Sequence, residues 1–72
     1  MNVKIPQISG IELVKKLRRF VVVRQRGSHI RLEKNLPEET IKITVPAHKN
    51  LKKGTLHNIL KTARLSLEEI LD

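Results

Sequence analysis

The side chains of this chain with the most obvious capacity for chemistry are its histidines, because histidine's ordinary pKa lies near neutrality. The chain has three of them: His29, His48 and His57. His29 differs from the other two because Arg24, Arg26 and Arg31 lie close to it in the sequence. A histidine among guanidinium groups is suited to proton transfer at a phosphate.

Cleavage of an RNA backbone by its own 2′-hydroxyl group is one reaction that such residues would serve. The reaction needs a base for the 2′-hydroxyl proton, an acid for the leaving 5′-oxygen, and cations that stabilise the crowded phosphorane. His29 would supply one proton-transfer group and the arginines the cations. The same residues would equally serve a phosphate-binding surface without catalysis, so the residues alone leave both interpretations open.

A second basic cluster, formed by Lys49, Lys52 and Lys53, leads into Gly54 and Thr55. We expect Thr55 to cap a helix over roughly residues 55–63. Free backbone N–H groups, the helix dipole and nearby lysines together favour phosphate contact at such a helix start, although a solvated loop is the simpler alternative.

The other two histidines carry weaker signals. His48 follows a predicted strand, where it would either orient a phosphate or serve only the loop structure. His57 falls in the first turns of the predicted helix, where the helix dipole disfavours positive charge, so we expect a neutral surface residue.

Metal and thiol chemistry find no support in the sequence. The chain has no cysteine, and its histidines and carboxylates show no metal-ligand spacing. We therefore expect no metal site and no cofactor.

The net charge indicates the class of partner. Fifteen lysines and arginines against seven acidic residues give a formal charge of +8, and the pI is near 10.5. A positive field of this kind attracts polyanions, above all nucleic acid. Phe20 is the only aromatic residue, so recognition by base stacking is nearly excluded. The alternative is that the charge matches an acidic protein.

The length and hydropathy of the chain indicate how many domains it forms and where the protein is located. We expect residues 1–72 to form one small domain with a thin core. The sequence shows no signal peptide and no apolar run that would span a membrane, which predicts a soluble, cytoplasmic protein without membrane contact.

The two ends of the chain predict helices. Residues 1–8 should form an extended lead-in. Ser9 and Glu12 have the spacing of a capping box, followed by Ile11, Leu13, Val14 and Leu17 in helical periodicity, so a first helix should run from Ser9 to near Arg19. Ser66 and Glu69 repeat this spacing and predict a last short helical turn.

The middle of the chain predicts three antiparallel strands. The stretch 20–23 should enter a hairpin whose turn contains Gly27, and Ile30 and Leu32 alternate with His29, Arg31 and Glu33. A cleaner alternation follows over residues 40–45, closed by Pro46. The expected fold class is α+β: a helix, a three-stranded antiparallel sheet and a helix, with both helices on one sheet face and His29 on the open one.

Three sequence blocks, in this order, resemble the HicA toxin family of type II toxin–antitoxin systems. They are VRQRGSH at residues 23–29, TVPAH at 44–48 and LKKGTLHNILK at 51–61, within a similarity that spans nearly the whole chain. Family members usually carry a glycine–aromatic pair between the first helix and the first strand, and many have a second histidine after Gly-Ser-His. In this chain the stretch from Leu17 to Phe20 runs straight into Val21, which implies a shorter turn, and Ile30 follows His29. We expect Ile30 to be a core residue.

The resemblance implies a double-stranded-RNA-binding-like fold and a metal-independent mRNA interferase, neutralised by a HicB-type antitoxin protein. It implies that the essential histidine is His29. Combined with the charge pattern, the residues expected to contact RNA are Arg24, Arg26, Ser28, Arg31, His48, Lys49, Lys52, Lys53 and Thr55. The alternative function is a non-catalytic basic RNA-binding module.

Overall fold

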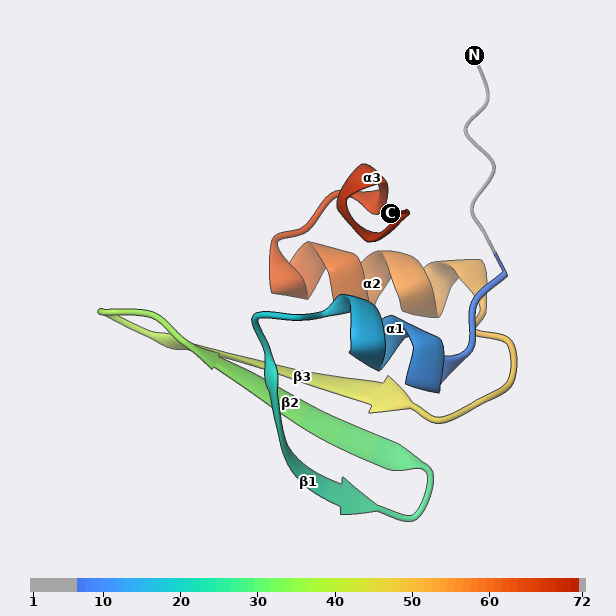
Figure 1. Ribbon diagram of the computed structural model, residues 1–72, viewed down its shortest axis with the longest axis horizontal. Coiled ribbons are helices and arrows are strands. Elements are labelled where there is room, and N and C mark those ends of the chain that lie inside the picture. Colours follow the sequence, from blue (N-terminus) through green and yellow to red (C-terminus); the bar gives the residue numbers. More distant parts are fainter. Residues whose placement is uncertain (1–6, 72) are drawn as a thin grey trace.

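The protein is a sheet of three antiparallel strands with helices packed on one of its faces (Figure 1). The structure, a computed structural model, describes residues 7–71. Its elements, in chain order, are α1 (Gly10–Lys16), β1 (Val21–Arg26), β2 (His29–Asn35), β3 (Thr40–Pro46), α2 (Lys53–Ala63) and α3 (Leu67–Ile70). This confirms the predicted α+β class and the order of helix, three strands and helix. The predicted lead-in falls mostly on residues 1–6, outside the described part.

Helix α1 begins at the predicted capping box. The Ser9 hydroxyl accepts a hydrogen bond from the Glu12 backbone N–H at 3.0 Å, and the Glu12 carboxylate accepts one from the Ser9 N–H at 3.2 Å. These hydrogen bonds from Ser9 lower the pKa of Glu12, because they favour its charged form. The prediction that the helix extends to near Arg19 was wrong: it ends at Lys16, and Leu17 leaves helical geometry. The residues after Leu17 form the turn that brings the chain into β1.

Strand β2 lies in the centre of the sheet and pairs antiparallel with both neighbours. Ile30 and Leu32 are buried, while His29 and Arg31 are exposed, as the alternation predicted. In β3, Ile41, Ile43 and Val45 are buried in the same way. The sheet therefore has one apolar face beneath the helices and one open polar face.

The core lies between this apolar face and the helices. Leu13 and Leu17 from the α1 region, and Leu56 and Leu60 from α2, pack with the buried strand residues. No polar or charged side chain is buried within residues 7–71. Ile11, expected on the apolar side of the first helix, is 55% exposed, because Leu13 and Leu17 form the buried stripe instead.

Strand β1 differs from the prediction in length and burial. It continues through Arg24 and Gln25 to Arg26, because these residues pair with β2 up to a two-residue turn at Gly27 and Ser28. All six of its residues are exposed, since α1 and α2 pack over β3 and leave β1 at the edge of the sheet (Figure 1).

Helix α2 begins two residues earlier than predicted, so Thr55 is not its cap. Lys52 occupies the cap position with extended backbone angles and no side-chain hydrogen bond, and Lys53 is the first helical residue. The Leu56 N–H already bonds the Lys52 carbonyl at 2.9 Å, which places Thr55 inside the first turn. The second capping box is confirmed: Ser66 and Glu69 bond each other's backbone N–H groups and start α3.

Gly10 joins α1 to the end of β3. A Cβ atom at this position would overlap the Pro46 carbonyl oxygen, and the Gly10 N–H donates to the His48 carbonyl at 2.9 Å. The backbone of α1 therefore touches the backbone that follows β3, which only glycine permits.

We predict that Gly10→Ala lowers the free energy of unfolding by about 1–3 kcal/mol, because backbone must shift to admit the methyl group. Gly54→Ala is the matched control: Gly54 lies in α2 with open space where its Cβ would be. The control should leave stability unchanged or raise it by up to about 1 kcal/mol, because alanine is the better helix former. Urea unfolding of both variants tests this, and equal stabilities would contradict the close packing at Gly10.

Candidate functional site

The open face of the sheet carries a cationic hollow at the hairpin end of β1 and β2. Across this pair, Arg26 lies opposite His29 and Arg24 lies opposite Arg31. Directly opposed residues of antiparallel strands present their side chains on the same face, about 5 Å apart. On the other side of β2, Thr44 lies opposite Arg31. These five residues line a hollow of about 270 Å³.

The tight turn at Gly27 and Ser28 sets this register. Gly27 has φ +59°, and Ser28 has no positive φ, which is the pattern of hairpin turns that take glycine first. A β-bulge between Val22 and Arg24 absorbs Val23 as an extra residue. Beyond the bulge, Val22 lies opposite Leu32, so β1 has a basic half beside His29 and an apolar half farther from the turn.

The electrostatics of the hollow favour an anion. Among residues 7–71, no carboxylate lines it, and none of its three arginines, Arg24, Arg26 and Arg31, forms an ion pair. The ion pair at 2.7 Å between Arg64 and Glu39 lies between α2 and the β2–β3 turn instead. All five lining residues are exposed, so an incoming phosphate can meet guanidinium groups that are not already committed to a carboxylate.

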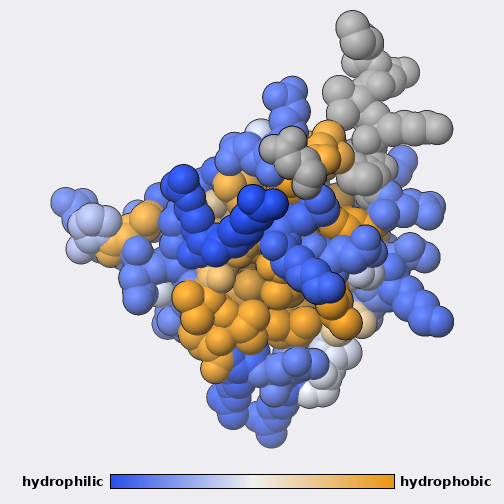
Figure 2. All heavy atoms as spheres, in the orientation of Figure 1, coloured by the Kyte–Doolittle hydropathy of each residue, from blue (hydrophilic) through white to orange (hydrophobic). Residues whose placement is uncertain are grey.

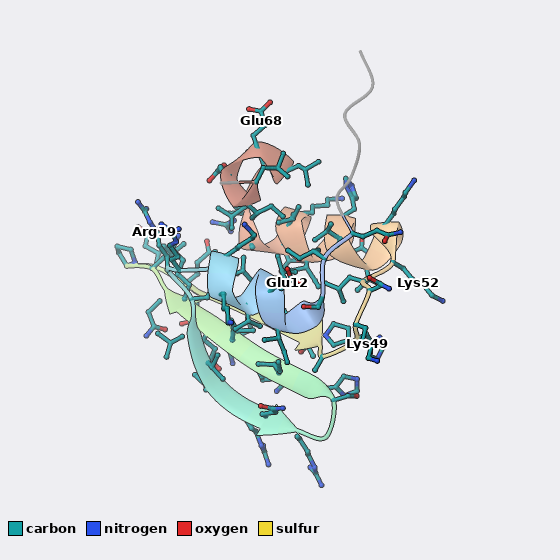
Figure 3. The ribbon with its side chains drawn as sticks, turned by 45° about the vertical axis from the view of Figure 1, so that its right-hand side comes forward. Glu12, Arg19, Lys49, Lys52 and Glu68 are labelled. Atoms are coloured by element: carbon teal, nitrogen blue, oxygen red, sulfur yellow. The ribbon has the colours of Figure 1, made fainter. Side chains whose placement is uncertain are left out.

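The loop after β3 is attached to the same end of the sheet. The Ala47 N–H donates to the Ser28 carbonyl at 2.6 Å, and the Leu51 N–H donates to the Ile8 carbonyl at 2.9 Å. His48 and Lys49 lie between these two anchors and are exposed. Figure 3 shows Lys49 beyond the end of the sheet and Lys52 beside the start of α2.

The structure thus divides the predicted RNA-contact residues into two groups. His29 gathers with Arg24, Arg26 and Arg31 in the hollow, and Ser28 is in the adjoining turn. The other group, on the loop and the start of α2, does not line the hollow: His48, Lys49, Lys52, Lys53 and Thr55. Thr55 is only partly exposed and Lys53 is exposed, so the lysines rather than Thr55 present the accessible polar groups here.

Sequence reasoning missed Thr44 as a lining residue. The signal was present, because Thr44 stands between the core residues Ile43 and Val45 and must therefore point to the open face. His57 lies elsewhere, in an apolar groove of about 530 Å³ between α2 and α3.

Residues 7–71 contain no group of three or more histidine or carboxylate side chains placed to hold a metal ion. No helix in the same range is long and apolar enough to cross a membrane.

Comparison with protein families decides the family of the chain. The family described as "HicA toxin of bacterial toxin-antitoxin" matches residues 11–65. The chain belongs to the HicA toxin family. As a HicA toxin it is the toxic component of a toxin–antitoxin system, and it has an antitoxin as partner. A search of curated proteins found no match.

The HicA match runs from the second residue of α1 past the end of α2, and so includes the hollow and the lysine cluster. Ile30, the residue after His29, is buried at 6% exposure in the core, as the alternation of β2 predicted. His29 is the histidine that lines the hollow of this HicA toxin.

We predict that Gly27→Ala lowers the free energy of unfolding by about 1–2 kcal/mol, because an L-residue with a Cβ is strained at positive φ. The space around Gly27 is open, so any loss comes from backbone conformation and not from a clash. Urea denaturation measures it. An unchanged midpoint would mean that the turn does not depend on the left-handed geometry of Gly27.

Proposed function

We propose that this HicA toxin is an endoribonuclease that cleaves mRNA in the cationic hollow, without a metal ion, with His29 as its proton-transfer residue. The observation that carries the proposal is the grouping of one histidine with three arginines that have no ion-pair partner in the described part of the chain. This set matches the needs of RNA cleavage by the neighbouring 2′-hydroxyl group.

The proposed reaction is a transesterification. The 2′-oxygen loses its proton and attacks the adjacent phosphorus, the bond from phosphorus to the 5′-oxygen breaks, and that oxygen gains a proton. The products are a 2′,3′-cyclic phosphate and a 5′-hydroxyl end. His29 serves as base for the first proton or as acid for the second, and water, which reaches this exposed face, serves the other transfer.

The arginines have a separate task in this mechanism. Arg26 lies opposite His29 in the pairing of β1 with β2, and Arg24 and Arg31 form the next opposed pair. Guanidinium groups bind non-bridging phosphate oxygens through paired N–H donors, and they neutralise the charge that builds up on the phosphorane. We therefore assign Arg24, Arg26 and Arg31 to binding and stabilising the scissile phosphate.

The lysine cluster extends the proposed RNA path. Lys49, Lys52 and Lys53 are exposed, and the loop that carries Lys49 is anchored to the Ser28 carbonyl beside the hollow through Ala47. Neighbouring phosphates of a bound strand would meet these lysines and the N-terminal N–H groups of α2. This path reads backbone charge and not bases, which agrees with a chain that has a single aromatic residue, itself buried. We propose a HicB-type protein as the antitoxin.

The first test is His29→Ala. We expect it to lower the rate of RNA cleavage by about 10²–10⁴-fold and to abolish growth arrest, because the proton-transfer group is removed. The fold should not change, since His29 is exposed. Cleavage of a labelled RNA with a chelator present measures the rate.

His57→Ala is the matched control, because His57 is also exposed but lies in the groove between α2 and α3. It should cleave RNA as fast as the parent. Equal rates for the parent and His29→Ala would refute the catalytic assignment. If the parent binds RNA but does not cleave it, the alternative of a non-catalytic RNA-binding module would be favoured.

The second test separates phosphate binding from catalysis. Arg24→Ala should weaken RNA binding and reduce the slope of log affinity against log salt by about one unit, because one phosphate contact is lost. Lys61→Ala removes one exposed positive charge from the groove between α2 and α3 and is the control. Salt titrations of both variants measure the slopes, and the same slope for both would exclude a specific phosphate contact by Arg24.

A further inference from the structure

The apolar half of β1 is an unpartnered edge of the sheet. Within residues 7–71 the strand order is β1-β2-β3, so β1 pairs there on one side only, and its other side presents backbone N–H and C=O groups that no strand of this range pairs with. Val21, Val22 and Val23 are 65%, 48% and 48% exposed, and Ile11 on α1 is exposed as well. Figure 2 shows apolar surface gathered over β1 and beside α1.

Val22 shows why this surface is open. It lies opposite Leu32, which is fully buried, so Val22 is on the same face of the sheet as the core. The helices pack over β3 and do not extend to β1, as Figure 1 shows, and Val22 therefore stays half exposed. The apolar face of the sheet therefore continues onto β1 at Val22, where no helix buries it.

Charges stand at both ends of the valine run. Arg18 and Arg19 come just before it and Arg24 and Arg26 just after it, and all four are exposed. At about 3.3 Å per residue along the strand, Arg24 and Arg26 lie within about 10 Å of Val23, and Arg18 and Arg19 lie in the turn that leads into Val21. The surface is therefore complementary to a segment that is apolar in its middle and acidic around it.

This charge pattern decides between occupants. A second copy of the chain would bring a second net charge of +8 and a second set of edge arginines against the first. An acidic segment would instead find ion-pair partners, and proteins commonly bind an exposed sheet edge by adding a strand to it. The antitoxin is the partner that membership of the HicA family gives this chain.

We propose that the antitoxin adds an acidic, partly apolar strand to the free edge of β1, with apolar side chains against Val22 and acidic side chains toward Arg24 and Arg26. An added strand lies about 4.8 Å from β1. Its carboxylates would then occupy the two arginines that, under the proposed function, bind the scissile phosphate. Binding of the antitoxin itself rests on the exposed edge and not on the catalytic assignment.

The test uses purified toxin and, as probe, its purified cognate antitoxin, titrated without RNA. Val22→Glu should weaken binding at least 10-fold, because it places a negative charge in the apolar contact. Leu71→Glu, at a residue 49% exposed after α3, makes the same change away from β1 and should stay within about twofold of the parent. Equal affinities for the two variants would overturn the proposal.

Two further measurements keep the proposal falsifiable if Val22→Glu folds poorly. Hydrogen exchange on the parent complex should slow for amides of residues 21–26, and slowing confined to other elements would overturn strand addition. Sedimentation of the toxin alone should give a monomer, whereas a dimer that Val22→Glu dissociates would assign the edge to a second copy.

Cleavage by folded Val22→Glu should equal that of the parent, and a parent that fails to cleave RNA would refute the proposed function without affecting the binding result.

Discussion

The packing of α1 and α2 against a single face of the sheet is the contact on which the rest of this structure depends. A three-stranded sheet in so short a chain has one apolar face to bury, and the two helices bury it with leucines such as Leu13 and Leu56. Because side chains alternate between the two faces along β2, burying Ile30 and Leu32 places His29 and Arg31 on the other face. The polar site therefore lies on the face of the sheet opposite the core.

Two close backbone contacts hold the parts of the site together. Gly10 sits against Pro46, and Ala47 donates to the Ser28 carbonyl, so the start of α1, the end of β3 and the β1–β2 turn meet at one end of the molecule. The loop with His48 and Lys49 continues from this junction toward α2. Catalytic and binding residues placed on short, anchored segments lose little entropy when a ligand arrives.

Strand β1 has a basic half that lines the hollow and an apolar half that we propose binds the antitoxin. The candidate site and the proposed inhibitory surface are therefore adjacent on one strand. Edge strands commonly carry charges and bulges that discourage pairing with other chains, and β1 has both: arginines at positions 24 and 26 and a bulge at Val23. The exposed valines of β1, in contrast, favour contact with another chain. A partner that contacted the valines and the arginines at once would neutralise the positive charge to which we assign RNA binding, and antitoxin binding would then be coupled to inhibition.

The sequence alone determined the local features. Both capping boxes, the alternation of β2 and β3, the outward position of His29 and the core position of Ile30 follow from residue spacing, because capping and pleating depend on neighbours a few residues away. The blocks around Gly-Ser-His and Lys-Gly-Thr also indicated the family. Tertiary structure decided the rest: the pairing of Arg24 and Arg26 with the His29 face, the place of Thr44 in the hollow, the start of α2 at Lys53, and the exposure of Ile11 and the β1 valines. These depend on strand register and on how far the helices reach across the sheet, and both are set by contacts between residues distant in the chain.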